Sequence, residues 1–246
     1  MKKICVDRLG KHSTHYRYCL NQESIPSKFV ADANDLIGIG RSGVVVGGKM
    51  DGIPIAIKVI PKDVFIPNED CGLTTDPDCQ IYDQKRFDIE VEQTKMLSKL
   101  GIVPELYYWD TVKLSDFEAS DVKDALDQPE SLFIMIMENF GHSLEYWLAK
   151  DENVFYKNEK SIKKQFFDLM RLIYDIDYFN MDAHFGNILY DPRRDKVKLL
   201  DVVLENVFIP EKMDQETLLS VLEDMWNNDK YHALAKISKK RKSEHL

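Results

Sequence analysis

Asp182, Asn187 and Asp201 form the most informative group of polar residues in the chain. Asn187 follows Asp182 within the run Asp182-Ala183-His184-Phe185-Gly186-Asn187, and Asp201 stands at the end of an apolar strand-like stretch. Phosphoryl transfer needs a carboxylate to orient the attacking hydroxyl, and it needs oxygen ligands for the magnesium ions that neutralise the phosphates. Each residue alone could be a helix cap, a turn residue or a strand terminator. The three in this order are residue types that phosphoryl transfer requires.

A second group lies earlier in the chain, where Gly38, Gly40 and Gly43 form a G-x-G-x-x-G pattern. β-Branched residues follow these glycines, which excludes the helix-opening turn of a dinucleotide site. A glycine-rich connection between two strands lets backbone amides approach phosphate groups closely. Lys58 then ends the apolar run Ile55-Ala56-Ile57-Lys58, where its ammonium needs a counter-charge. The phosphates of ATP would supply one.

Together the two groups resemble the protein-kinase superfamily. The glycine-rich pattern G-x-G-x-x-G-x-V is complete at 38–45, and the run ending at Lys58 is similar to the family's V-A-I-K strand. Asp182 and Asn187 match the D-x-x-x-x-N catalytic loop, and Asp201 falls where the Asp of D-F-G belongs. The resemblance covers residues 36–203 or thereabouts. It implies an α+β, two-lobed kinase-like fold with a truncated helical C-lobe and with Mg-ATP between the lobes.

The resemblance also implies a role for each matching residue. Asp182 would be the catalytic base or would orient the acceptor hydroxyl. Asn187 and Asp201 would bind Mg²⁺, and Lys58 with its Glu partner would grip the α- and β-phosphates of ATP. Lys58 would pair with a Glu on the following helix; the spacing favours Glu90 and leaves Glu92 open. Glu138 would lie at the adenine-binding hinge. The expected ATP-binding residues are Ile37, Gly38, Gly40, Gly43, Val45, Ala56, Lys58, Glu90 and Glu138.

The chain departs from typical protein kinases at several of these positions. Asn180-Met181-Asp182 replaces H-R-D, and His184 stands where Ser/Thr kinases carry Lys. Asp201-Val202-Val203 replaces D-F-G, and no A-P-E follows. The favoured activity is phosphorylation of a protein Ser or Thr by a compact kinase, similar to those of large DNA viruses and bacterial effectors. His184 keeps open a small-molecule phosphotransferase of the aminoglycoside or choline kinase type, and a nucleotide-binding pseudokinase is the third alternative.

Hydrophobic periodicity predicts the elements that must position these residues. Short strands are expected between 36 and 137, with a hairpin connection at 47–52, followed by a helix over 87–100. The stretch 115–130 reads as a solvated connector or short polar helix. Helices are expected at 143–148 and 161–176, a hairpin over 187–200, and two closing helices. The expected divisions are an N-terminal extension (1–35), an N-lobe (36–138) with an insert near 67–83, a minimal C-lobe (139–210), and C-terminal helices with a basic tail (211–246).

Composition bounds the remaining possibilities. The formal net charge of −9 disfavours general nucleic-acid binding, although the run 236–242 holds five Lys or Arg and could contact nucleic acid or serve localisation. No apolar run reaches the length of a membrane-spanning helix, and the N-terminus lacks an apolar signal core. The cysteines at 5, 19, 71 and 79 show no zinc spacing, so reduced thiols in a cytoplasmic protein are expected, in host cytoplasm for a virus or effector. The expected partner is a protein substrate, without a membrane.

Overall fold

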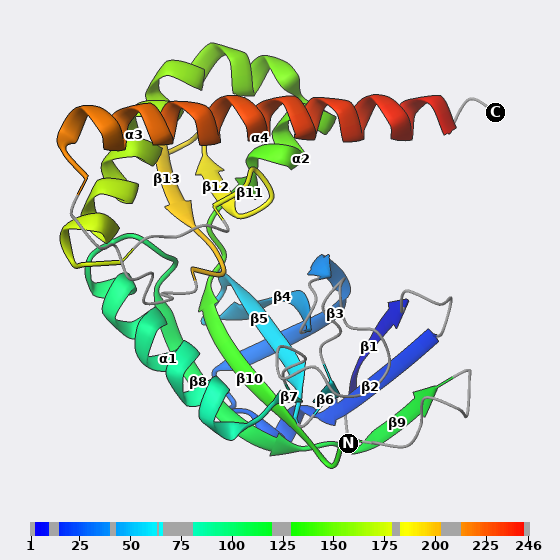
Figure 1. Cartoon of the computed structure of the whole chain (residues 1–246). Coiled ribbons are helices and arrows are strands. Elements are labelled where there is room, and N and C mark those ends of the chain that lie inside the picture. The colour runs from blue at the N-terminus through cyan, green and yellow to red at the C-terminus, as the bar shows by residue number, and fades with distance from the viewer. Residues whose placement is uncertain are drawn as a thin grey trace. The chain divides into compact units, whose positions relative to one another are not determined.

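The computed structural model describes residues 3–9, 15–39, 43–62, 64–65, 81–119, 129–178, 183–202 and 213–243 (Figure 1). The chain divides into two compact units. The first comprises Met1–Lys95 and Glu105–Asn139, and the second comprises Met96–Pro104 and Phe140–Leu246.

A five-stranded antiparallel sheet organises the first unit. Its strands lie in the order β3-β4-β5-β10-β8, namely β3 (Phe29–Ile39), β4 (Val44–Met50), β5 (Ile53–Pro61), β10 (Ser131–Glu138) and β8 (Leu106–Lys113). β5 and β10 are apolar at almost every position because both faces of the sheet are covered. The strand predicted at 132–137 is confirmed. The expected connection at 47–52 is mostly strand, and only Asp51 and Gly52 form the turn.

One face of this sheet is covered by the N-terminal residues. β1 (Lys3–Leu9), β2 (His15–Asn21) and β9 (Asp116–Ala119) form a three-stranded sheet, and Ile4 and Leu20 share a core with Ile57 and Ile134. A short 3₁₀ helix, η1 (Gln22–Ser24), leads into β3. The expected boundary after residue 35 therefore falls inside β3. The connector or helix expected at 115–130 is wrong at its start, which is β9; residues 120–128 lie outside the described residues.

The expectation of reduced thiols is wrong for two of the four cysteines. Cys5 and Cys19 face each other across the β1–β2 pair and form a disulfide, with Cα atoms 4.1 Å apart. Directly opposed residues of an antiparallel pair lie at the separation a disulfide needs. Cys71 and Cys79 lie outside the described residues. The prediction of a cytoplasmic protein relied on reduced thiols, and Cys5 and Cys19 do not provide them.

Helix α1 (Gln84–Lys99) covers the opposite face of the five-stranded sheet, as Figure 1 shows. Its Phe87 and Val91 pack with Phe133 and Met135 of β10, and the helix ends before Gly101, which has a positive φ of 73°. The helix predicted over 87–100 is confirmed, starting one turn earlier. A two-stranded ladder of β6 (Val64–Phe65) and β7 (Ile81–Tyr82) precedes it. Most of the insert expected near 67–83 lies outside the described residues.

The second unit is mainly helical. Its elements are β11 (His142–Ser143), α2 (Leu144–Lys150), α3 (Glu152–Asp175), β12 (Ile188–Asp191), β13 (Lys196–Leu199) and α4 (Gln215–Ser243). The predicted hairpin at 187–200 is confirmed as β12 and β13. α3 begins nine residues before the expected start, and its buried residues include Phe155, Phe166 and Ile173.

A single helix, α4, stands where two closing helices were expected, and it includes the basic run through Lys242. No Gly or Pro occurs between Gln215 and Ser243, so the sequence offers no stop signal. Asp214 caps the start by accepting the backbone N–H of Thr217 at 2.7 Å, and this bond lowers the pKa of Asp214. α4 packs against α2 and α3 and buries Trp226 in the core (Figure 1).

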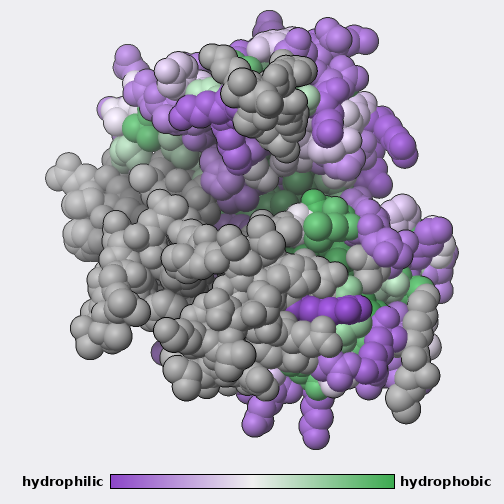
Figure 2. Space-filling view, turned by 90° about the vertical axis from the view of Figure 1, so that its right-hand side faces the viewer, coloured by the Kyte–Doolittle hydropathy of each residue, from purple (hydrophilic) through white to green (hydrophobic). Residues whose placement is uncertain are grey.

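The α+β class predicted from the sequence is confirmed; the finer kinase-like, two-lobed fold stays a prediction. None of the described helices is both long enough and apolar enough to cross a membrane. In the view of Figure 2, most of the described surface is hydrophilic, in line with a chain in which 30% of residues are charged.

Candidate functional site

Lys58 lies on the α1-facing side of the five-stranded sheet. Residues of β5 alternate between the two faces, so Ala56 and Lys58 share this face while Ile57 points to the other. Val45 of β4 and Met135 of β10 stand directly opposite Lys58 in the strand register. Val45 and Ala56, predicted from the sequence to contact ATP, are therefore on the same face as the lysine.

The Lys58 ammonium is paired with a carboxylate from α1. Its Nζ donates to Oε1 of Glu90 at 2.8 Å, and Lys58 is only 9% exposed. A buried ammonium needs such a partner to offset the cost of desolvation. Of the two glutamates considered from the sequence, Glu90 is the partner of Lys58. Glu92 instead pairs with Lys95 on the same helix at 2.6 Å.

Tyr82 is a second partner of Glu90, and the sequence did not predict this contact. Its hydroxyl donates a hydrogen bond to Oε2 of Glu90. Burial, reinforced by the negative charge of Glu90, raises the pKa of Tyr82 above its ordinary value of 10. Tyr82 thus stays protonated, and stays a donor, across the physiological pH range. A tyrosine just before a helix carries no signal that its hydroxyl will reach a residue two turns later.

We expect Tyr82 to remain un-ionised in native protein well above pH 10. A raised pKa in the folded state gives stability that is fully present below pH 10 and is lost as the pH rises beyond that value. Phenolate absorbance at 295 nm should therefore rise equally in wild type and in Tyr82→Phe until the protein unfolds. The melting temperature of the wild type should also fall more steeply above pH 10 than that of Tyr82→Phe. A full extra phenolate signal from the native wild type near pH 10 would contradict this expectation.

The described glycines of the G-x-G-x-x-G pattern have different surroundings. A Cβ on Gly43 would lie 2.2 Å from the carbonyl oxygen of Val59, so glycine is needed here for the close approach of β4 to β5. A Cβ on Gly38 would meet nothing within 4 Å, and Ile37 beside it is 40% exposed. Gly40 lies outside the described residues. Packing within the sheet is thus sufficient to explain Gly43, whereas it does not explain Gly38.

Glu138 is the last residue of β10 and pairs with Ile55 of β5. Its backbone N–H donates to the carbonyl oxygen of Glu105 at 2.8 Å. This amide is consequently engaged within the chain, and a ligand contact at Glu138 would have to use the carbonyl group. The hinge role predicted for Glu138 stays a prediction.

In the second unit, the β12–β13 hairpin brings the backbones of Asn187 and Asp201 close together. The backbone N–H of Leu200 donates to the carbonyl oxygen of Asn187 at 2.7 Å, one residue before Asp201. Ile188 pairs with Leu199 in the next step of the register. Two residues separated by the whole hairpin are therefore neighbours at its open end.

Asp201 adopts a left-handed backbone conformation, with φ of 46°. Asp is one of the few residues other than Gly that tolerate this region, and such positions cluster at functional sites. Leu199 and Val202 on either side are buried, whereas Asp201 is exposed. An amide oxygen and a carboxylate oxygen suit Mg²⁺, so Asn187 and Asp201 fit a magnesium site by donor chemistry. Within the described ranges, no group of three or more His, Cys, Asp or Glu side chains is placed to hold a metal.

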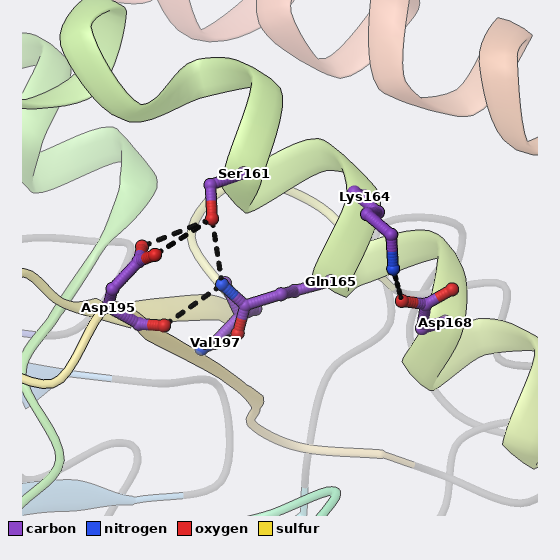
Figure 3. A network of polar contacts seen from close by, with 6 residues as sticks. All are labelled: Ser161, Lys164, Gln165, Asp168, Asp195 and Val197. Carbon is purple, nitrogen blue, oxygen red and sulfur yellow. Dashed lines mark hydrogen bonds and ion pairs between the residues drawn. The ribbon is translucent and has the colours of Figure 1, made fainter.

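A polar network fastens the turn of the same hairpin to α3 (Figure 3). Ser161 donates to the carboxylate of Asp195 at 3.0 Å, and Gln165 donates to the Asp195 carbonyl oxygen at 3.0 Å while accepting the N–H of Val197 at 3.2 Å. Lys164 and Asp168 form a separate pair along the helix at 2.6 Å. Gln165 thus satisfies the carbonyl group of Asp195 and the N–H of Val197, and the network ties the turn of the hairpin to α3.

Asp182, the predicted catalytic base, lies outside the described residues, as do Asn180 and Met181. The residues that follow it are anchored: Ala183 and Phe185 are buried in the core of the second unit. His184 Nδ1 accepts the backbone N–H of Gly186 at 3.0 Å, and its carbonyl oxygen accepts the N–H of Asn187 at 2.7 Å.

No family model matches this chain, and no curated protein matches it either. A functional assignment therefore rests on the chain's own residues and on their geometry.

Proposed function

We propose that this protein is an ATP-dependent phosphotransferase, and that it transfers phosphate to a protein Ser or Thr. The observation that carries the proposal is the ion pair of the buried Lys58 with the partly exposed Glu90, formed at 2.8 Å between β5 and α1. A lysine on an otherwise apolar sheet face, paired with Glu90, places a positive charge where apolar packing alone would not require it.

The surroundings of this pair also support the proposal. Val45 and Ala56 are apolar neighbours of Lys58 on the same sheet face, and a Cβ added at Gly38 would meet nothing within 4 Å. The strand order β3-β4-β5-β10-β8, with α1 packed on one face, is what the resemblance to protein kinases implies for an N-lobe.

Each residue has a distinct part in the proposed reaction. Lys58 holds the α- and β-phosphates of ATP, and Glu90 keeps Lys58 oriented. Asn187 and Asp201 hold Mg²⁺, which neutralises phosphate charge. Asp182 accepts the proton of the acceptor hydroxyl as its oxygen attacks the γ-phosphorus and ADP leaves. The acceptor thereby gains the phosphoryl group, and no oxidant or reductant is required.

A small-molecule acceptor is the second candidate, and His184 is the observation that favours it. Its imidazole stands two positions after Asp182, where the resemblance associates His with small-molecule phosphotransferases. Its Nδ1 accepts the backbone N–H of Gly186 at 3.0 Å, which orients the ring.

The experiment is incubation of purified protein with γ-labelled ATP, Mg²⁺ and a lysate, followed by separation of protein from small molecules. Label on protein Ser or Thr supports the proposal, whereas label in the small-molecule fraction supports the second candidate. Lys58→Met should remove the label, and Lys49→Met, a change of the same kind on neighbouring β4, should not. Nucleotide binding with no transfer to either fraction would favour a pseudokinase.

We expect the enzyme to be active as synthesised, without phosphorylation after Asp201. The segment 202–209 contains no Ser, Thr or Tyr, and Met181 replaces the Arg that would hold an activation-loop phosphate. Phosphatase treatment, followed by removal of the phosphatase, should leave the initial rate unchanged. A severalfold fall that is restored by incubation with ATP would place control elsewhere, for example at Ser161.

A further inference from the structure

Tyr82 and Lys58 occupy the two oxygens of one carboxylate. Lys58 Nζ donates to Oε1 of Glu90 at 2.8 Å, and the hydroxyl of Tyr82 donates to Oε2. Lys58 comes from β5, Glu90 from the middle of α1, and Tyr82 from β7. Side chains from β5 and β7 thus meet at Glu90 of α1.

The ring of Tyr82 is fixed by packing. It is 2% exposed and lies 5.7 Å, centroid to centroid, from Phe133, which itself stacks on Phe87 at 4.4 Å. The guanidinium of Arg86 lies over the ring of Tyr82, 5.6 Å from its centroid. A hydroxyl on a ring held in this way cannot follow a moving partner, and a buried phenol needs an acceptor. The position of the Tyr82 oxygen is therefore set by the packing of its ring.

Glu90 is less constrained by its own position. Its side chain is 28% exposed, and a partly solvated ion pair on a flexible side chain contributes little by itself. A second hydrogen bond to the charged carboxylate is of the stronger kind and restricts the rotamer. We propose that Tyr82 is a positioning residue that holds Glu90 in its pair with Lys58, so that the phosphate-binding lysine is assembled before nucleotide binds.

This inference rests on the proposed function for its meaning, because it describes how that site is regulated. Where an activation-loop phosphate would normally be expected to stabilise the active arrangement, segment 202–209 offers no acceptor hydroxyl. A fixed tyrosine achieves the same result without a modification. The ion pair is then a permanent feature of the folded chain and not a switch.

The test is Tyr82→Phe, which removes one oxygen and keeps the packed ring. Tyr108→Phe is the matched control, since the Tyr108 hydroxyl donates to Asp110 at 2.6 Å in the same unit and Tyr108 packs on the core of the opposite sheet face from Lys58. We expect Tyr82→Phe to raise the KM for ATP on the order of tenfold, the size of one hydrogen bond to a charged group, with a much smaller change in kcat. Tyr108→Phe should leave both unchanged.

A double-mutant comparison separates positioning from general stability. Because Tyr82 acts through Glu90, adding Tyr82→Phe to Glu90→Gln should raise the KM for ATP no further. Additive effects of the two changes, or a lowered melting temperature with an unchanged KM, would overturn the positioning role.

A measurement without nucleotide distinguishes failure of this inference from failure of the proposed function. Acetic anhydride labels lysine amines, and mass spectrometry reports the extent at Lys58 in folded protein. Tyr82→Phe should increase labelling of Lys58 severalfold over wild type and Tyr108→Phe, because Glu90 no longer covers the amine. Unchanged labelling would overturn the inference even in an active enzyme. Increased labelling in a protein that binds no ATP would uphold the inference about Glu90 and reject the phosphotransferase.

Discussion

Replacing Asp182 by Asn will abolish phosphate transfer while leaving the affinity for Mg-ATP close to that of the wild type. Asn keeps the shape of Asp and loses its ability to accept a proton, so the variant removes the proposed base alone. Loss of a general base typically slows a reaction by on the order of 10²–10⁴-fold. The buried neighbours Ala183 and Phe185 anchor the chain after this position, so local folding should survive the change.

Single-turnover transfer from γ-labelled ATP measures the rate, and equilibrium binding of Mg-ATP measures the affinity. Asp175→Asn, an identical change in the exposed last turn of α3, is the control and should retain the wild-type rate. A wild-type rate in Asp182→Asn would reject Asp182 as the base. A rate that falls only in proportion to lost ATP binding would make Asp182 a nucleotide-binding residue instead.

The second large effect concerns metal-dependent stabilisation by ATP. A ligand at 100 times its Kd stabilises the folded state by about 2.7 kcal/mol. For a chain of this size that amounts to a rise in Tm of roughly 5–10 °C. We expect most of this rise with Mg²⁺ and little of it with EDTA, because Asn187 and Asp201 are the proposed metal ligands. Asp201→Ala should remove most of the difference between the two conditions.

The backbone of Asp201 affects the choice of variant. Ala is disfavoured at a φ of 46°, whereas Asn tolerates it, so Asp201→Asn removes the charge with less strain. Asp224→Ala, a change on the exposed face of α4, controls for the loss of one carboxylate elsewhere in the second unit. Equal rises in Tm with magnesium and with EDTA in the wild type would contradict the metal assignment and favour a pseudokinase.

Local patterns were sufficient to predict the strands β5 and β10, helix α1 and the β12–β13 hairpin. Each has strong periodicity or clear turn residues, such as the apolar run 132–137 and the Asp-Pro turn after Tyr190. The pairing of Lys58 with a Glu of the next helix came from the resemblance to protein kinases, and the spacing to Gly101 favoured Glu90 over Glu92.

Features that depend on distant contacts were not predictable in this way. Tyr82 acts on Glu90 only because β7 returns beside β6 and directs the ring beneath α1. The Cys5–Cys19 bridge depends on the exact register of β1 with β2, in a region treated as an extension. The early start of α3 was not predicted because the polar run 157–161 separates Phe155 from Ile162, and Phe155 packs on Trp226, which is distant in the sequence.

Because Cys5 and Cys19 are cross-linked, the free energy of unfolding of this chain depends on whether the solution is reducing or oxidising. Closing a loop of about 15 residues lowers the entropy of the unfolded chain by an amount worth about 3 kcal/mol in the chain-entropy model. The bridge lies in the sheet whose residues share a core with β5, the strand that carries Lys58. Protein held in dithiothreitol and protein held in air are therefore two different reference states, and a ligand-induced shift in Tm has meaning only within one of them.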